Sequence, residues 1–216
     1  MNNEDNCKTI DMHCDTLMRA YFRDKDDLFT CPEFDLDISR MIESGMMAQF
    51  FAIFVPSAKE YARYEKEYKG DDEYIDKCAS IFNHTVQKHA DVVAKATSAK
   101  EILDNYAGHK VSAILTMEDG VAVQGDMKKL DYFHSLGVRA LSLTWNYENC
   151  FGYPNSKDPE IMQKGLKDFG KEAVKHMQEI GMLVDVSHLS DGGFYDVYKL
   201  SKVPFIATHS NARALC

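Results

Sequence analysis

Five side chains that can bind metal ions follow predicted strands at widely spaced positions in the sequence. The stretch "TIDMHCDTLMR", residues 9–19, places a histidine and an aspartate two residues apart near a strand end. Successive side chains of an extended strand point to opposite faces, so these two share one face and Cys14, between them, points away. The full set is His13, Asp15, Glu118, His188 and His209.

These residue types predict a metal site with two ions. Three imidazoles and two carboxylates suit zinc or another first-row divalent ion better than calcium. Five ligands are too many for one tetrahedral ion with an open position, but they suit two ions about 3.5–4 Å apart that share a carboxylate. Glu118 is the natural bridge and the expected catalytic carboxylate.

Each of these residues also has a purely structural explanation. A histidine at a strand end is more often a hydrogen-bonded structural residue than a ligand, and Asp15 and Glu118 could each cap a following helix. Asp185, in "VDVSH", faces opposite to His188 by strand parity, and it either supports the site or has a packing role. Asp119 is expected to be a turn residue. Together, five such residues at strand ends favour a site.

Alternating strands and helices are expected to position these residues. Helical spacing of apolar residues predicts helices over 72–89, 126–136 and 166–180, and Ser98 with Glu101 predicts a capping box before another helix. Glycines 45, 108, 137 and 181 lie between helices and strands, where a left-handed cap is common. Near-continuous apolar runs, typical of parallel strands buried on both faces, occur at about 9–13, 46–55, 111–117, 138–144, 182–187 and 204–208.

This pattern predicts an α/β fold of the (β/α)₈ TIM-barrel type. In such a barrel the carboxyl ends of all strands gather on one face, where active sites are built. We expect one domain over residues 1–216, with about six of the eight βα units. Two stretches depart from the pattern: residues 19–35 are charged and irregular, and residues 145–165 form a long polar and aromatic loop. Loops of that length are often binding loops, and a plain surface excursion is the alternative.

Composition excludes several function classes. The chain has 216 residues and a formal net charge of -9, which argues against a general nucleic-acid binder. No stretch approaches the ~20 apolar residues of a membrane span, and the N-terminus lacks the features of a signal peptide. The six scattered cysteines include no C-x-x-C pair, so we expect free thiols and a cytoplasmic protein.

Four ordered motifs resemble the renal, or membrane, dipeptidase family of zinc metallopeptidases along essentially the whole chain. They are "DMHCDT", "MEDG", "VDVSHLSD" and "ATHSNARAL", and "LGVRALSLTWNYEN" resembles the bacterial branch. The resemblance implies a (β/α)₈-type barrel with two zinc ions that acts on small dipeptides. His13 and Asp15 would hold one zinc, and His188 and His209 the other. Glu118 would bridge them, and a hydroxide between the ions would attack the scissile carbonyl.

The chain departs from the family pattern in three places. A histidine that helps to stabilise the oxyanion in many members is replaced by Trp145, so Trp145 and Asn146 are the expected substrate-binding residues. An aromatic residue that lines the substrate pocket in some members is Met18. Family members are also usually longer, so we expect this chain to lack the last two strands, the aspartate that acts as general acid or base, and the arginine that fixes the substrate carboxylate.

Two alternatives remain open from the sequence. The first is an inert, metal-binding partial barrel, whose open strand edges would favour a homo-oligomer. The second is another binuclear hydrolase on a similar barrel, such as an amidohydrolase or a phosphotriesterase-like enzyme. Those enzymes typically use an H-x-H first strand, whereas this chain has H-x-D. A small dipeptide is the expected partner, with no nucleic acid and no membrane.

Overall fold

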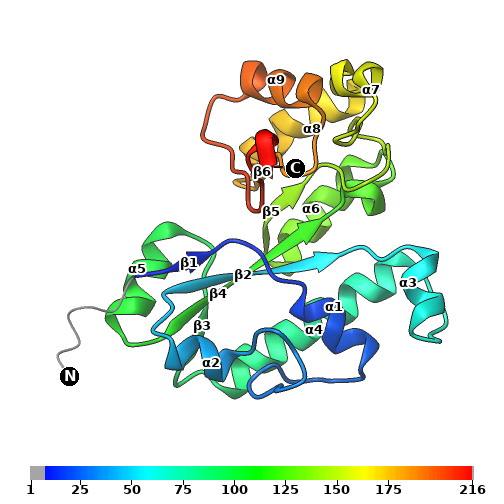
Figure 1. Ribbon diagram of the computed structural model, residues 1–216. Helices are drawn as coiled ribbons and strands as arrows, with labels where there is room; N and C mark the ends of the chain where they lie inside the picture. Colours follow the sequence, from blue (N-terminus) through cyan, green and yellow to red (C-terminus); the bar gives the residue numbers. More distant parts are fainter. Residues whose placement is uncertain (1–7, 216) are drawn as a thin grey trace. The chain divides into compact units, whose positions relative to one another are not determined.

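The computed structural model describes residues 8–215, and the side chains of residues 8–214. The chain forms two compact units, the first ending at Leu115 and the second beginning at Thr116. Both contain parallel strands joined by helices, which gives an α/β fold (Figure 1). Among the described residues, no helix is long and apolar enough to cross a membrane. The expectation of one domain over 1–216 stays a prediction.

The first unit is built on the strands β1 (Ile10–Asp11), β2 (Ala48–Phe54), β3 (Val93–Lys95) and most of β4 (Val111–Glu118). β1 pairs with β2, β3 pairs with β4, and β2 neighbours β4, all within this unit. Every residue of β2 and β4 is buried, as their continuous apolar sequences predict. β3 was not predicted, because three residues are too few to show a period.

Helices cover these strands. They are α1 (Thr16–Phe22), α2 (Ile38–Glu43), α3 (Ala58–Arg63), α4 (Asp71–Lys88) and α5 (Ala99–Ala107). α1 packs against β2 and α4, and α4 confirms the helix predicted over 72–89. Ser98 caps α5 by accepting from the Glu101 N–H, but the Glu101 carboxylate accepts from Thr97. The predicted capping box is therefore only half formed.

The second unit contains the end of β4, followed by β5 (Val138–Ser142) and β6 (Leu183–Asp185), which pair in parallel. Its helices are η1 (Gly120–Val123), α6 (Met127–Leu136), α7 (Pro159–Gln163), α8 (Asp168–Glu179), α9 (Asp191–Leu200) and η2 (Arg213–Leu215). α6 packs on β5, and α8 packs on β6 and α9. The strand predicted at 204–208 is wrong as a full strand, because only Ile206 forms a bridge, to Asp185.

Three of the four predicted glycine joins have the left-handed backbone that ends a helix. Gly45, Gly137 and Gly181 have φ of 73°, 105° and 76°. At the fourth join, Gly108 has φ of -84° and the next residue, His109, takes the positive φ of 60° instead. The turn therefore falls one residue later than the sequence indicates.

The irregular segment before α2 is held by a buried aspartate. Asp37 is only 2% exposed and accepts hydrogen bonds from the backbone N–H groups of Cys31 and Arg40 and from the Ser39 hydroxyl. The Arg40 guanidinium pairs with Asp37 at 3.0 Å and also donates to the Phe34 carbonyl. The segment before α2 is thus held by hydrogen bonds to the Asp37 carboxylate and from the Arg40 guanidinium.

The long loop over 145–165 is anchored on α8 by backbone contact. The Lys167 N–H donates to the carbonyl of Phe151, whose side chain is fully buried. A Cβ at Gly170, in the first turn of α8, would lie 2.1 Å from that carbonyl oxygen. Helix and loop approach this closely only because residue 170 has no side chain.

Replacing Gly170 by alanine should therefore destabilise the protein by about 1–3 kcal/mol, because the loop backbone must move. Gly152→Ala is the matched control, since its Cβ would make only ordinary contacts of 3.4–3.7 Å, with Leu166 and the Gly165 carbonyl oxygen. Urea unfolding of both variants measures the difference. Equal stability of the two variants would contradict the close approach.

The Asp37 cluster predicts a pH dependence of stability. Burial raises the pKa of Asp37, but the hydrogen bonds from Arg40, Cys31 and Ser39 outweigh it and lower the pKa from 3.8 to about 2. A carboxylate with a depressed pKa stabilises the fold above its unfolded pKa and loses that contribution as the pH falls through the folded one.

Wild type should therefore exceed Asp37→Asn in unfolding free energy by roughly 2 kcal/mol or more at pH 6. The gap should shrink between pH 4 and pH 2. Denaturant titrations at pH 6, 4, 3 and 2 measure it, with Asp35→Asn as the exposed control. A gap that stays constant over this range would refute the assignment.

Candidate metal centre

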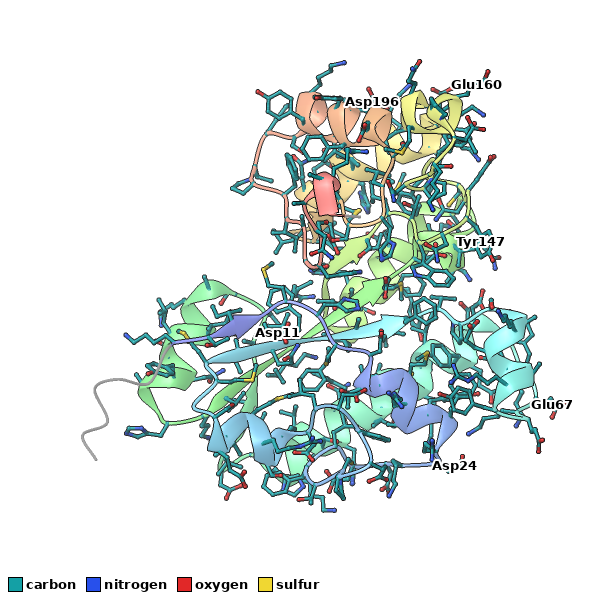
Figure 2. All side chains as sticks on the ribbon, viewed as in Figure 1. Asp11, Asp24, Glu67, Tyr147, Glu160 and Asp196 are labelled. Carbon is teal, nitrogen blue, oxygen red and sulfur yellow. The ribbon has the colours of Figure 1, made fainter. Side chains whose placement is uncertain are left out.

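The first unit presents a histidine and a carboxylate just beyond β1. His13 Nε2 lies 3.5 Å from Asp15 Oδ1, although both residues lie beyond the end of β1, where strand parity no longer applies. The His13 backbone N–H donates to the carboxylate of Asp11. Asp11, which is labelled in Figure 2, is the last residue of β1. Asp15 occupies the N-cap position of α1, but its side chain makes no capping hydrogen bond. Helix capping therefore does not account for Asp15.

Cys14, between these two residues, has a protonated thiol and is poorly suited to bind a metal ion. Burial raises the pKa of the Cys14 thiol to about 12. A thiolate is the form that binds metals, so the protonated thiol is a weak candidate. Among the described cysteines, Cys14, Cys31, Cys78 and Cys150 are free. The expectation of free thiols at Cys7 and Cys216 falls outside the described residues.

The second unit brings three of the predicted ligands together. Glu118 Oε1 lies 3.0 Å from His188 Nε2 and 3.3 Å from His209 Nε2. The two imidazole nitrogens are 2.7 Å apart. Glu118 is 3% exposed, whereas the histidine side chains retain about a quarter of their exposure. Three donor atoms from three separate segments thus meet at the end of β4.

This donor set fits a zinc ion or a similar divalent cation. Zinc binds nitrogen and carboxylate oxygen at about 2.0–2.2 Å, so neighbouring donors in a tetrahedral site lie roughly 3.3 Å apart. One of the three observed spacings, 3.3 Å, matches that value, and the other two, 3.0 Å and 2.7 Å, are shorter. A buried carboxylate and two imidazole nitrogens are the donor types that such an ion takes, and the two nitrogens would move apart by a few tenths of an ångström to hold it.

In the turn after β4, Asp119 and not Glu118 caps the following helix η1, so the Glu118 carboxylate is not used as a helix cap. Asp119, with a positive φ of 71°, accepts from the Val121 N–H at the start of η1 and from Asn149. Burial raises the pKa of Asp119 to about 6, against the lowering effect of these two hydrogen bonds. Asp119 is a turn residue, as expected, and it is also buried.

Asn149 connects this turn to the long loop. Its amide nitrogen donates to Asp119 Oδ1 and to the Leu143 carbonyl, and its oxygen accepts from the Phe151 N–H. These hydrogen bonds hold the chain directly after β5, where the loop begins. In this first part of the loop Trp145 is half-buried and Asn146 is exposed. Asn149 is not among the residues predicted from the sequence, although its place four residues after Trp145 in a polar loop was a signal.

His209 also has hydrogen-bond partners that were not predicted from the sequence. Its Nδ1 lies 2.8 Å from the Thr208 hydroxyl, and its backbone N–H donates to the Ser187 hydroxyl. The hydroxyl residues directly preceding both downstream histidines, in "VSH" and "ATH", were the available signal.

A cavity of about 630 Å³ opens beside the His13 and Asp15 pair, within the first unit. Met18 and Tyr64 contribute apolar wall, and Arg63 contributes a cation. Met18 is the position that the family resemblance assigns to the pocket wall. A volume in this range suits a small ligand.

Comparison with known proteins identifies relatives along almost the whole chain. Residues 4–216 match the family model described as Membrane dipeptidase (Peptidase family M19). An uncharacterised protein of Acinetobacter calcoaceticus is 29% identical over 96% of this chain and 71% of its own length. A dipeptidase of Aspergillus oryzae is 29% identical over 93% of this chain, which spans only 46% of that relative.

Solved structures agree with the sequence relatives. A metallopeptidase from Rhodobacter sphaeroides, crystallised with a phosphinate mimic of L-Ala-D-Ala, has a TM-score of 0.78 at 28% identity. The match covers 97% of this chain and 67% of that one. A second dipeptidase structure has a TM-score of 0.77 at 28% identity, with 66% of its chain covered. These matches confirm a partial TIM-barrel fold. The chain belongs to the membrane dipeptidase family of metallopeptidases, which are hydrolases.

Proposed function

We propose that this protein is a zinc-dependent dipeptidase that hydrolyses the peptide bond of small dipeptides. The observation that carries the proposal is the convergence of Glu118, His188 and His209 in a member of this family. The dipeptide mimic bound by the Rhodobacter relative supports the substrate class.

The proposed centre contains two zinc ions. His13 and Asp15 would hold one, His188 and His209 would hold the other, and Glu118 would supply the carboxylate that they share. The spacing of ligand atoms within each unit supports the two groups separately. The bridge itself rests on ligand chemistry, since five ligands suit two ions that share a carboxylate.

Bound zinc would supply Lewis-acid polarisation of the scissile carbonyl and a nucleophile derived from water at neutral pH. This chain's own residues provide the surroundings. The Glu118 side chain is buried, and low solvent exposure strengthens the attraction between a carboxylate and a cation. The 630 Å³ cavity beside His13 and Asp15 receives the side chain of the dipeptide's first residue, with Met18 in its wall. Trp145 and Asn146 contact the substrate from the loop that follows β5.

The compartment and assembly are part of the same proposal. Free thiols at the four described cysteines suit a reducing compartment, and we place the protein in the cytoplasm. We also propose a homo-oligomer.

The proposal predicts that purified protein contains two zinc ions per chain and hydrolyses L-Ala-L-Ala or L-Leu-Gly. Chelation should abolish turnover, and added zinc should restore it. Elemental analysis and an amine-release assay measure the two quantities on the same sample. Zinc without turnover would support the inert metal-binding alternative, and the absence of both would refute the proposal.

Glu118→Gln should lose one zinc ion or both, because the bridge loses its charge while keeping its shape. Glu172→Gln is the matched control, since Glu172 is an exposed carboxylate of α8 that pairs with Lys175. Zinc per chain after dialysis against a weak chelator measures the difference. Two tightly held zinc ions in Glu118→Gln would remove the bridging assignment.

A further inference from the structure

A buried carboxylate at the end of β6 organises the segments that carry the two downstream histidines. Asp185 is 1% exposed. Its Oδ1 accepts from the backbone N–H groups of Ser187 at 3.0 Å and Thr208 at 3.1 Å. Its Oδ2 accepts from the hydroxyls of Ser142 at 2.5 Å and Thr208 at 2.6 Å. The two oxygens thus have different tasks: Oδ1 holds backbone and Oδ2 orients hydroxyl groups.

The hydroxyl of Thr208 has only one proton, and this fixes the direction of the next hydrogen bond. An ionised carboxylate can only accept, so Thr208 donates its proton to Asp185. Thr208 Oγ1 must then accept from its other partner, His209 Nδ1, which lies 2.8 Å away. His209 therefore carries its ring proton on Nδ1, and its Nε2 carries the lone pair that can bind a cation.

The two contacts of the Ser187 hydroxyl agree with this proton count. Thr208 Oγ1 can accept a second hydrogen bond, which the Ser187 hydroxyl supplies at 3.2 Å. Ser187 Oγ in turn accepts from the backbone N–H of His209, also at 3.2 Å. Every donor in this set has one acceptor. His209 Nε2 itself faces Glu118 Oε1 at 3.3 Å and His188 Nε2 at 2.7 Å, so with its proton on Nδ1 it accepts from the Nε2–H of His188 in the metal-free chain.

We propose that Asp185 is a positioning residue that selects the metal-binding tautomer of His209 through the Thr208 hydroxyl. The inference rests on the proposed function, because it assumes that His209 Nε2, 3.3 Å from Glu118 and 2.7 Å from His188, binds a cation. In the opposite tautomer an N–H would point at the same place and would exclude the ion. Hydrogen bonding of the far nitrogen is how proteins generally set the tautomer and orientation of a ligating histidine.

Asp185→Asn separates this role from simple loop tethering. The asparagine oxygen can keep both backbone hydrogen bonds of Oδ1, while its NH₂ group replaces the acceptor Oδ2 with a donor. Thr208 would then accept from this NH₂ group and donate to His209 Nδ1, which moves the imidazole proton to Nε2. The fold contacts are preserved and the direction of the relay is reversed.

The first measurement is the tautomer of His209 in the metal-free chain, from ¹⁵N shifts of the imidazole nitrogens at a pH where the ring is neutral. Wild type should be protonated at Nδ1, and Asp185→Asn should be protonated at Nε2. The second measurement is zinc affinity by competition with a chromophoric chelator. Asp185→Asn should bind zinc about 10–100-fold more weakly than wild type.

Ser142→Ala is the matched control, because it removes the other hydroxyl from Asp185 Oδ2 without touching the histidine. It should keep the Nδ1 tautomer and zinc affinity within about threefold of wild type, well inside the loss typical of outer-shell partners. Thr208→Val should weaken zinc binding like Asp185→Asn, and Thr208→Ser should restore it. This pair decides the matter if Asp185→Asn does not fold.

An unchanged His209 tautomer in Asp185→Asn would overturn the relay, whether or not affinity falls, because a fall alone would then reflect loop structure. Equal zinc affinity in Asp185→Asn and Ser142→Ala would also overturn it. Failure of wild type to bind zinc or cleave dipeptides would refute the proposed function instead, while the tautomer comparison would still test the relay.

Discussion

The carboxylate of Glu118 is the constraint on which the second unit depends. A buried negative charge is costly unless it is paired or bound to a cation, and here two imidazole nitrogens face one of its oxygens. The strand that carries it, β4, is buried along its whole length, so the carboxylate is largely shielded from solvent. The turns after β4 and β6 and the Thr208–His209 segment therefore converge on this carboxylate.

Other buried polar groups fix those turns. Asp119 and Asn149 join the turn after β4 to the loop after β5, and Asp185 joins the end of β5 to the segments of His188 and His209. These side chains are hydrogen-bonded to several donors, which offsets the cost of burying them. The turns lie beyond the strand ends, where backbone pairing between strands stops. Hydrogen bonds to these side chains therefore hold the chain there.

Membership of the membrane dipeptidase family settles the choice between hydrolase families that the ligand pattern left open. The chain spans 46% of the Aspergillus dipeptidase and 67% of the Rhodobacter metallopeptidase. Within that span it contains the H-x-D pair, the Glu118 turn and both downstream histidines.

The sequence by itself determined the long elements and the residue types at their ends. Continuous apolar runs predicted β2, β4 and β5, because strands buried on both faces have apolar residues at nearly every position. Helical spacing of apolar residues predicted α4, α6 and α8, because a helix buried on one face repeats its apolar residues every three or four positions. Only the tertiary structure decided the backbone conformation and the hydrogen bonds of the segments that follow the strands. His188 has a φ of 65° in the turn after β6, so strand parity could not relate it to Asp185. β3 and Ile206 pair through neighbours distant in sequence, and the direction of the Asp185–Thr208–His209 hydrogen bonds depends on atoms that only folding brings together.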